Sequence, residues 1–204
     1  MTAQSLRQRL ISQFHRPRGV VGRAVGWFMA HRGSNRRRNI WVVGLLDLRP
    51  TDRVLEVGFG PGIAIAELAR RVTQGRVYGI DHSEVMVRQA TRRNAAAIRA
   101  GRVELLHAPV DRLPTFDTPF DVVLAVNSLG FWPDPAQRLS ELRDLLRPGG
   151  RIVLVSQPRC AGANAGTTER AGRELRDRLI AAGLTDTRLE TLDLDPPVAC
   201  VIAR

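Results

Sequence analysis

The feature that most constrains this chain is an apolar, strand-like run that ends in a glycine-rich turn, Val54-Leu-Glu-Val-Gly-Phe-Gly-Pro-Gly62. Such turns need backbone angles that are costly for residues other than glycine. In α/β proteins, a strand that enters such a turn and opens a helix holds the part of a nucleotide-like ligand that lies against the main chain. A side chain at Gly58 or Gly60 is therefore expected to fill the ligand's space. The alternative is a plain strand-to-helix turn.

The chain around this turn alternates between strands and helices. Apolar runs without regular alternation are typical of parallel strands that helices cover on both faces. Strands are expected over residues 53–58, 76–81, 103–108, 120–127, 151–157, 187–193 and 198–203. Helices are expected over residues 62–72, 83–100, 135–146 and 168–182, and a turn at Arg147-Pro-Gly-Gly.

The last two expected strands are separated by a short break at Pro196-Pro197, which favours a hairpin. A hairpin places one antiparallel strand at the end of an otherwise parallel sheet. The prediction is an α/β fold: a Rossmann-like, doubly wound, seven-stranded and mostly parallel sheet with a terminal antiparallel strand and helices on both faces. A length of 204 residues allows one full domain and hardly a second.

The basic charge is concentrated before the first strand. Residues 1–50 hold ten arginines and one acid, whereas residues 51–204 hold 21 arginines and 19 acids. The densest point is the run Arg36-Arg37-Arg38. This run either meets phosphates, an anionic membrane surface or an acidic partner, or is the solvated edge of a helix.

Apolar residues in the same segment recur at helical spacing. They predict two amphipathic helices before the first strand, joined by a turn over residues 31–35. The two stripes are Val20, Val21, Ala24, Val25, Phe28 and Met29, and Ile40, Trp41, Gly44, Leu45 and Leu48. We expect residues 1–49 to form a lid over the site, and residues 50–204 to form the ligand-binding domain.

The composition excludes several kinds of site. All 31 basic residues are arginine, so neither a phosphate-binding lysine nor a Schiff-base lysine is available. Cys160 and Cys200 have no histidine pair nearby, which argues against a zinc site and a disulfide framework. The longest apolar stretch near the N-terminus is far shorter than the about 20 residues that a membrane span needs. We expect a reduced, cytoplasmic protein without a membrane span.

Two acids stand where they can bind a ribose or a charged group. Glu56 precedes the first glycine of the turn by two residues, and strand alternation turns it away from Leu55 and Val57. Asp81 ends the second expected strand, where a carboxylate can accept hydrogen bonds from both hydroxyls of a ribose. The alternatives are that Glu56 pairs with an N-terminal arginine and that Asp81 caps the next helix.

Three stretches together resemble a class I S-adenosylmethionine-dependent methyltransferase, over about residues 45–157. They are Glu56-Val-Gly-Phe-Gly-Pro-Gly62, Asp81-His-Ser-Glu-Val-Met86 and Leu145-Leu-Arg-Pro-Gly-Gly-Arg-Ile-Val-Leu154. Ile63 stands where the dinucleotide fingerprint has its third glycine, which argues against an NAD enzyme. The stretch Phe131-Trp-Pro-Asp-Pro135 follows the fourth expected strand. In this respect the chain is similar to the small bacterial enzymes related to quinone-ring and lipid-like methyltransferases.

The resemblance implies that S-adenosyl-L-methionine is the cofactor and S-adenosyl-L-homocysteine the product. It implies that Gly58, Gly60 and Gly62 approach the methionine part of the cofactor. Glu56 would hold that end electrostatically, and Asp81 would bind the ribose.

The resemblance also places residues around the adenine. His82 and Met86 would flank the ring. Where the family commonly has an adenine-binding aspartate, this chain has Pro109, which offers neither a carboxylate nor an amide hydrogen. The backbone amide of Val110, Asp111 or water is therefore expected to bind the adenine.

The reacting end is less well specified by the sequence. Asn127 is expected to face the reactive end of the cofactor; the alternative is that it only terminates the strand. No catalytic residue is assigned, although His15 and His31 lie in the segment expected to cover the site. We expect no metal, because the nearest acids, Asp121 and Asp134, lie on either side of Asn127 and are unpaired.

The predicted function is methyl transfer to a small, apolar or aromatic acceptor, EC 2.1.1.-. Phe131, Trp132 and the helix over residues 20–29 are expected to line its pocket. One alternative is a nucleic-acid methyltransferase, in which three phosphate contacts from Arg36-Arg37-Arg38 predict a log-affinity slope of about −2.7 against log salt. Another is a non-catalytic cofactor-binding protein. The oligomeric state stays open.

Overall fold

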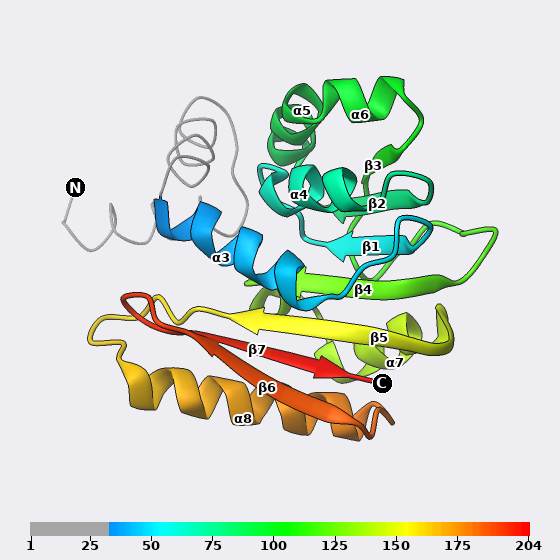
Figure 1. Cartoon of the computed structure of the whole chain (residues 1–204). Helices are drawn as coiled ribbons and strands as arrows, with labels where there is room; N and C mark the ends of the chain where they lie inside the picture. The colour runs from blue at the N-terminus through cyan, green and yellow to red at the C-terminus, as the bar shows by residue number, and fades with distance from the viewer. Residues whose placement is uncertain (1–32) are drawn as a thin grey trace, which may run out of the picture.

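The structure is a computed structural model and describes residues 33–204. From β1 onward it is an alternation of strands and helices (Figure 1). In chain order the elements are α3 (Gly33–Leu45), β1 (Arg53–Val57), α4 (Ile63–Arg71), β2 (Arg76–Asp81), α5 (Glu84–Arg93), α6 (Ala95–Arg99), β3 (Val103–His107), β4 (Phe120–Val126), the 3-10 helix η1 (Leu129–Phe131), α7 (Pro135–Asp144), β5 (Leu146–Ser156), α8 (Ala165–Ala181), β6 (Thr187–Leu192) and β7 (Val198–Ala203).

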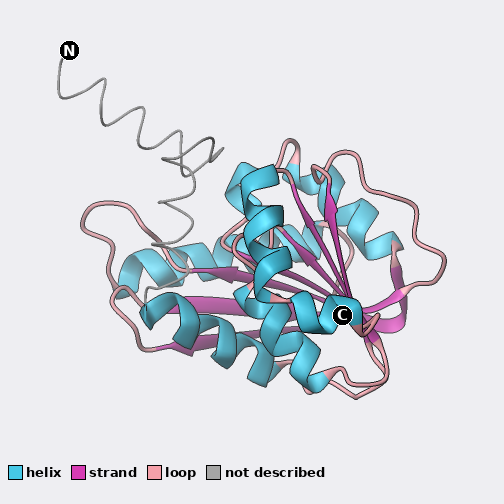
Figure 2. Cartoon of the chain, turned by 90° about the horizontal axis from the view of Figure 1, so that it is seen from above, coloured by secondary structure: helices cyan, strands magenta, loops and turns pink. Residues whose placement is uncertain are grey.

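The strands form one seven-stranded sheet in the order β3-β2-β1-β4-β5-β7-β6. The first five strands pair in parallel, whereas β7 is antiparallel to both β5 and β6. The predicted fold class is therefore confirmed, with the terminal antiparallel strand inserted between β5 and β6. The strand order reverses between β1 and β4, and open α/β sheets bind ligands beside such a reversal. The strands fan out as sheet twist requires (Figure 2).

Each face of the sheet carries its own hydrophobic core. One core joins the sheet to α3, α4 and α5, through residues such as Val42 and Leu68. The other joins it to α7 and α8, through residues such as Leu139 and Leu179. Helices thus cover both faces, and α3 packs beside α4 at the C-terminal end of β1 and β4.

Two expected elements differ from those in the structure. The helix expected over residues 83–100 is divided into α5 and α6 at Asn94, whose side-chain nitrogen donates to the carbonyl oxygens of Ala90 (2.9 Å) and Gly62 (3.2 Å). The stretch expected as a turn at residues 147–150 belongs to β5, which begins at Leu146 and pairs there with Phe120. The register then shifts, so those turn-like residues form an irregularity within the strand.

The helix α3 confirms a helix before the first strand. Its expected apolar face is confirmed in part, because Trp41, Leu45 and Leu48 pack against the core. The helix begins at Gly33, so the part of the expected turn from residue 33 onward is wrong. Ile40 of the expected apolar stripe is exposed, and Trp41 is only half-buried. The buried residues are Asn35, Arg38, Asn39, Val42 and Val43. The helix expected over residues 20–29, His15 and His31 lie outside the described residues.

Candidate functional site

The glycine-rich turn leaves β1 in the left-handed backbone region. Gly58, Gly60 and Gly62 have φ angles of 76°, 53° and 73°. A Cβ at Gly58 would lie 2.5 Å from that of Ser128, and a Cβ at Gly62 would lie 2.7 Å from that of Ala90. A Cβ at Gly60 would meet nothing within 4 Å. The expectation that a side chain fills ligand space therefore suits Gly60, whereas at Gly58 the chain's own Ser128 is met first.

Asp81 ties this turn to the start of α5. Its Oδ2 accepts a hydrogen bond from the Gly60 amide, and its Oδ1 accepts one from the Ser83 amide, both at 2.8 Å. Burial raises the pKa of Asp81, and the hydrogen bonds from Ser83 and Gly60 oppose that shift. Each carboxylate oxygen keeps a second acceptor site. The contact with α5 and ribose binding are thus compatible, and ribose binding stays a prediction.

Glu56 is turned toward the α3 side of the sheet, because Leu55 and Val57 point into the opposite core. The side chain is 2% exposed, and its Oε2 has no hydrogen-bond partner among the described residues. Burial and the nearby Asp81 charge raise its pKa well above the ordinary value, and Arg38 lowers it. Within residues 33–204, no ion pair of 4.0 Å or less joins Glu56 to an arginine, and Arg38 acts on Glu56 through its charge alone. The arginines of residues 1–32 lie outside the described residues, so the alternative of a pairing with an N-terminal arginine stays open.

These residues border a cavity of about 1120 Å³ at the C-terminal ends of β1, β2 and β4. Its volume slightly exceeds the about 300–1,000 Å³ of typical small-molecule pockets. Among the residues predicted to bind the cofactor, those that line it are Glu56, Gly58, Gly60, Asp81, His82, Met86, Val110 and Asn127. Gly62 does not line it, because this residue is packed against Ala90 of α5.

One end of the cavity holds the residues expected around an adenine. His82, Met86 and Val110 line it together with Pro109. Met86 is buried, whereas His82 is half-buried, and the His82 carbonyl oxygen lies 3.0 Å from Nε2 of His107. The Val110 amide donates to no residue in the described range. It is therefore available to an adenine, as predicted from the absence of a carboxylate at Pro109.

Asn127 also lines the cavity. It follows β4 with a left-handed φ of 54°, and its Oδ1 accepts a hydrogen bond of 2.7 Å from the Gln157 amide. Next to it, Ser128 Oγ donates to the carbonyl oxygen of Val57 at 2.6 Å. Asn127 therefore terminates the strand and also lines the cavity, and its position at the reactive end of the cofactor stays a prediction.

The sequence analysis missed the wall that α3 and the segment after β5 contribute. Asn35, Arg38, Asn39 and Arg159 all line the cavity. Within the run interpreted as a solvated helix edge, Arg36 and Arg37 are exposed but Arg38 is only 5% exposed. The sequence contains one signal for this wall. At helical spacing, Asn35, Arg38 and Asn39 lie on the same face of the helix as the apolar residue Val42.

Residues 33–204 show neither a metal-binding cluster nor a membrane-spanning helix. That part of the chain contains no group of three or more His, Cys, Asp or Glu side chains arranged to hold a metal ion. None of its helices has the length and apolar character needed to cross a membrane.

The sequence matches the family described as "Methyltransferase domain" over residues 54–150. It is 30% identical over 180 residues to "Uncharacterized methyltransferase YdaC" of Bacillus subtilis (strain 168), covering 88% of this chain and 96% of that protein. It is 32% identical over 130 residues to "Ubiquinone/menaquinone biosynthesis C-methyltransferase UbiE" of Geotalea daltonii, covering 62% of this chain and 55% of that protein.

The fold is similar to that of solved methyltransferases. An S-adenosylmethionine-dependent methyltransferase from Aquifex aeolicus superposes with a TM-score of 0.66 at 23% identity, over 81% of this chain and 88% of that one. Magnesium protoporphyrin IX methyltransferase from Synechocystis, solved with bound S-adenosylmethionine, superposes with a TM-score of 0.63 at 21% identity, over 82% of this chain and 78% of that one.

Proposed function

Because the chain belongs to the class I S-adenosylmethionine-dependent methyltransferases, we propose that it methylates a small apolar or aromatic acceptor that enters the same cavity as the cofactor. The observation that carries this proposal is one cavity whose lining includes His82, Met86, Asn127 and Trp132. Its wall holds both the residues assigned to an adenosine and the aromatic side chains of Phe131 and Trp132. A cofactor and an acceptor can therefore meet inside it.

The residues present fit the cofactor. Gly60 has open space where a Cβ would stand, and Glu56 holds a buried carboxylate oxygen without a partner in the described range. We assign the ribose hydroxyls to Asp81, the α-ammonium of the methionine part to Glu56, and the adenine to the Val110 amide. Met86 and His82 would then contact the ring faces. Gly62 would act indirectly, through the close packing of the turn on α5.

The chain's contribution to the reaction is positional. S-adenosylmethionine supplies an electrophilic methyl group whose leaving thioether needs no proton. The bond from the methyl group to sulfur breaks as the bond to the acceptor atom forms, and an acceptor that carries a proton there releases it; no residue is assigned to take this proton. The protein must hold the acceptor atom in line with the methyl group and exclude water, and orientation of this kind supplies about 7–11 kcal/mol. We assign Asn127 to the reacting end of the cofactor, because it lines the cavity and its side chain is fixed by the backbone amide of Gln157.

The acceptor end of the cavity supports an apolar or aromatic molecule. Trp132 is buried beside the cavity, whereas Phe131 is 46% exposed and lies at its rim. An exposed aromatic side chain beside a buried one offers a flat surface for a ring. We also propose that residues 1–49 act as a lid, since α3, the described part of that segment, already forms one wall.

The nucleic-acid alternative loses one of its three expected contacts. Arg38 is buried, so only the exposed Arg36 and Arg37 remain for phosphates. Two contacts predict a log-affinity slope of about −1.8 against log salt. RNA binding with a steeper slope would need further arginines and would favour this alternative.

Calorimetry tests the proposed function. The protein should bind S-adenosylhomocysteine and S-adenosylmethionine and give no heat with NAD. Asp81→Asn, which keeps the shape of the side chain and removes its charge, should weaken both, while exposed Arg92→Gln is the matched control. With labelled S-adenosylmethionine, transfer to a panel of quinols and phenols but not to RNA is expected. NAD binding without S-adenosylhomocysteine binding would contradict the proposal.

A further inference from the structure

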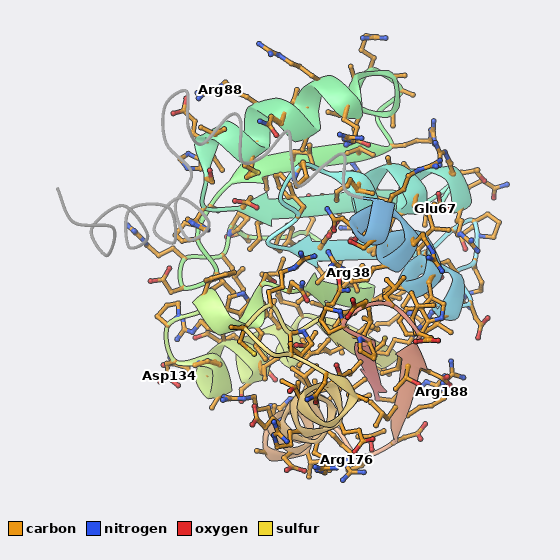
Figure 3. All side chains as sticks on the ribbon, turned by 90° about the vertical axis from the view of Figure 1, so that its left-hand side faces the viewer. Arg38, Glu67, Arg88, Asp134, Arg176 and Arg188 are labelled. Carbon is orange, nitrogen blue, oxygen red and sulfur yellow. The ribbon has the colours of Figure 1, made fainter. Side chains whose placement is uncertain are left out.

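Arg38 is a buried cation on the cavity wall. It is among the buried residues of α3. In Figure 3 Arg38 lies near the middle of the view, whereas Arg88, Arg176 and Arg188 lie toward the outline of the molecule. Its Nη1 donates to Oε1 of Gln157 at 2.7 Å, and its Nη2 donates to Oδ1 of Asn35. Both partners are neutral amides. The remaining donor that is buried, Nε, has no partner among the described residues.

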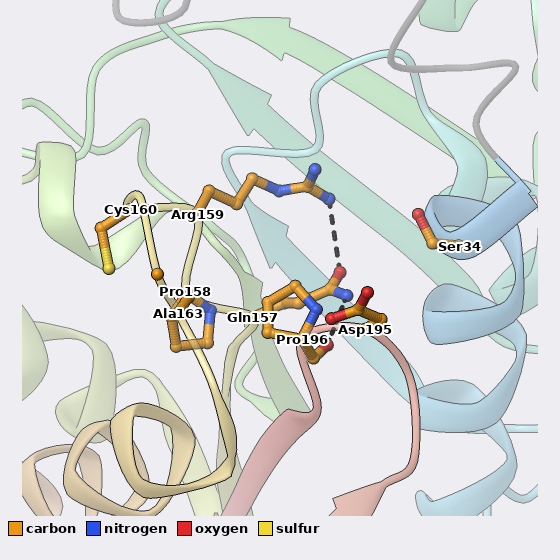
Figure 4. Close-up of a pocket in the computed structure, with 9 residues that line it drawn as sticks. Ser34, Gln157, Pro158, Arg159, Cys160, Ala163, Asp195 and Pro196 are labelled. Atoms are coloured by element: carbon orange, nitrogen blue, oxygen red, sulfur yellow. Dashed lines mark hydrogen bonds between the residues drawn. The ribbon is translucent and has the colours of Figure 1, made fainter.

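The charge of Arg38 is poorly balanced by its surroundings. Arg159 donates to the same Gln157 oxygen at 3.3 Å, so two guanidinium groups converge on one neutral acceptor. Figure 4 shows the Arg159 and Gln157 side chains, and the hydrogen bond between them, beside a second hollow of about 370 Å³. Arg159 lines both hollows. Burial and Arg159 lower the pKa of Arg38 to about 9, and Glu56 opposes that shift. The group still carries its charge at neutral pH.

Glu56 lies on the same side of the sheet and is a buried acid whose charge is also poorly balanced. One of its oxygens has no partner among the described residues, and its charge and that of Arg38 influence each other without forming an ion pair. An α-amino acid group carries a carboxylate and an ammonium on one carbon. Of the groups in the cofactor, only this zwitterion supplies an anion for Arg38 and a cation for Glu56 together.

We propose that Arg38 binds the α-carboxylate at the methionine end of the cofactor, opposite Glu56. This proposal rests on the proposed function of the site. A guanidinium can donate two parallel hydrogen bonds to a carboxylate, which is stronger than its present bonds to neutral amides. Gln157 is then a positioning residue, because its side chain holds Arg38 and its backbone amide holds Asn127. In this arrangement a side chain of α3 contacts the cofactor directly.

Calorimetry with three ligands tests the proposal. S-adenosylhomocysteine carries the α-carboxylate, decarboxylated S-adenosylmethionine lacks it, and 5′-methylthioadenosine lacks the whole amino acid. Arg38→Gln should weaken S-adenosylhomocysteine about 10- to 100-fold, the loss of a charged hydrogen bond. It should leave the affinities for the other two ligands unchanged. Arg37→Gln, an exposed neighbour, should change none of the three, and Arg38→Lys should restore part of the loss.

Stability separates this role from a structural one. Because Arg38 is buried beside another cation, Arg38→Gln should leave the melting temperature of the ligand-free protein unchanged or higher. Equal weakening of all three ligands, or a lower melting temperature with unchanged S-adenosylhomocysteine affinity, would overturn the proposal and leave the proposed function intact. Failure of the unaltered protein to bind any of the three would overturn the proposed function as well.

Discussion

Two buried acids on neighbouring strands, Glu56 of β1 and Asp121 of β4, have opposite surroundings. Asp121 lies near the start of its strand and accepts hydrogen bonds from the Arg53 amide (2.7 Å), from Nη2 of Arg49 (3.2 Å) and from Nε of Arg147. Glu56 lies near the end of its strand, and its Oε2 has no partner within residues 33–204. The two ends of one sheet thus treat a buried carboxylate differently.

The pKa values follow this difference. Burial raises the pKa of Asp121, but the hydrogen bonds from the Arg53 amide and from Arg147 outweigh burial, so the net pKa is lowered. At Glu56, burial and the charge of Asp81 raise the pKa well above the ordinary value. A fully partnered acid stabilises the fold, whereas an acid with one unpartnered buried oxygen, such as Glu56, has an acceptor available for a ligand.

The largest expected effect concerns Asp81, which is both partnered and exposed to the cavity. Asp81→Ala should weaken S-adenosylhomocysteine binding by about 2–4 kcal/mol, because two ribose hydroxyls lose a charged partner. It should also lower the stability of the ligand-free protein, since the amides of Gly60 and Ser83 lose their acceptor. Calorimetry and thermal unfolding measure the two effects. Unchanged affinity would reduce Asp81 to a contact at the start of α5.

Asp121 should affect stability alone. Asp121→Asn should lower the free energy of unfolding by about 1.5–3 kcal/mol, because charge-assisted hydrogen bonds from Arg49 and Arg147 are weakened. The affinity for S-adenosylhomocysteine should stay unchanged, because Asp121 is remote from the cavity lining. Urea unfolding and calorimetry check both statements. A loss of affinity without a loss of stability would break the contrast with Glu56.

Glu56 should show the reverse pattern. Glu56→Gln should weaken the binding of S-adenosylhomocysteine by about 1–2 kcal/mol, because the α-ammonium keeps a hydrogen-bond partner but loses a negatively charged one. Its free energy of unfolding without ligand should be unchanged or higher, since an amide costs less to bury than an unpaired carboxylate. The same two measurements apply. A large loss of stability would mean that Glu56 is partnered in solution.

The smallest expected effect is a difference in pH dependence. Glu56 has a raised pKa when folded, so its contribution to stability is present at low pH and is lost as the pH rises above its ordinary value of 4.5. Asp121 has a lowered pKa, so its contribution is present above 3.8 and is lost as the pH falls below that value. Urea unfolding of Glu56→Gln and Asp121→Asn from pH 3 to 8 should separate the two trends; parallel curves would contradict them.

The parts of the site that follow β1 and β2 were predictable because their signals are local. An apolar run, three glycines and an acid at a strand end identify the turn and Asp81 wherever the rest of the chain lies. For the loop after β3, the sequence predicted that a side-chain carboxylate is missing, because Pro109 cannot replace an aspartate. The Val110 amide is available there instead.

The α3 wall was not predictable by the same reasoning, because its buried face begins with polar residues. A search for apolar stripes selects Ile40, yet Asn35, Arg38 and Asn39 are buried by their contacts with each other and with Gln157, far away in the sequence. The division of the helix at Asn94 likewise depends on the Gly62 carbonyl oxygen, a tertiary contact. Local patterns carry no information on such partners.

A crystal structure of the protein with S-adenosylhomocysteine tests the central claim most directly. The account predicts the adenosyl group in the cavity, with ribose hydroxyls within hydrogen-bond distance of Asp81 and the amino acid end between Glu56 and Arg38. Density for the ligand elsewhere, or a cavity closed by the chain's own side chains in crystals that hold the ligand, would contradict it.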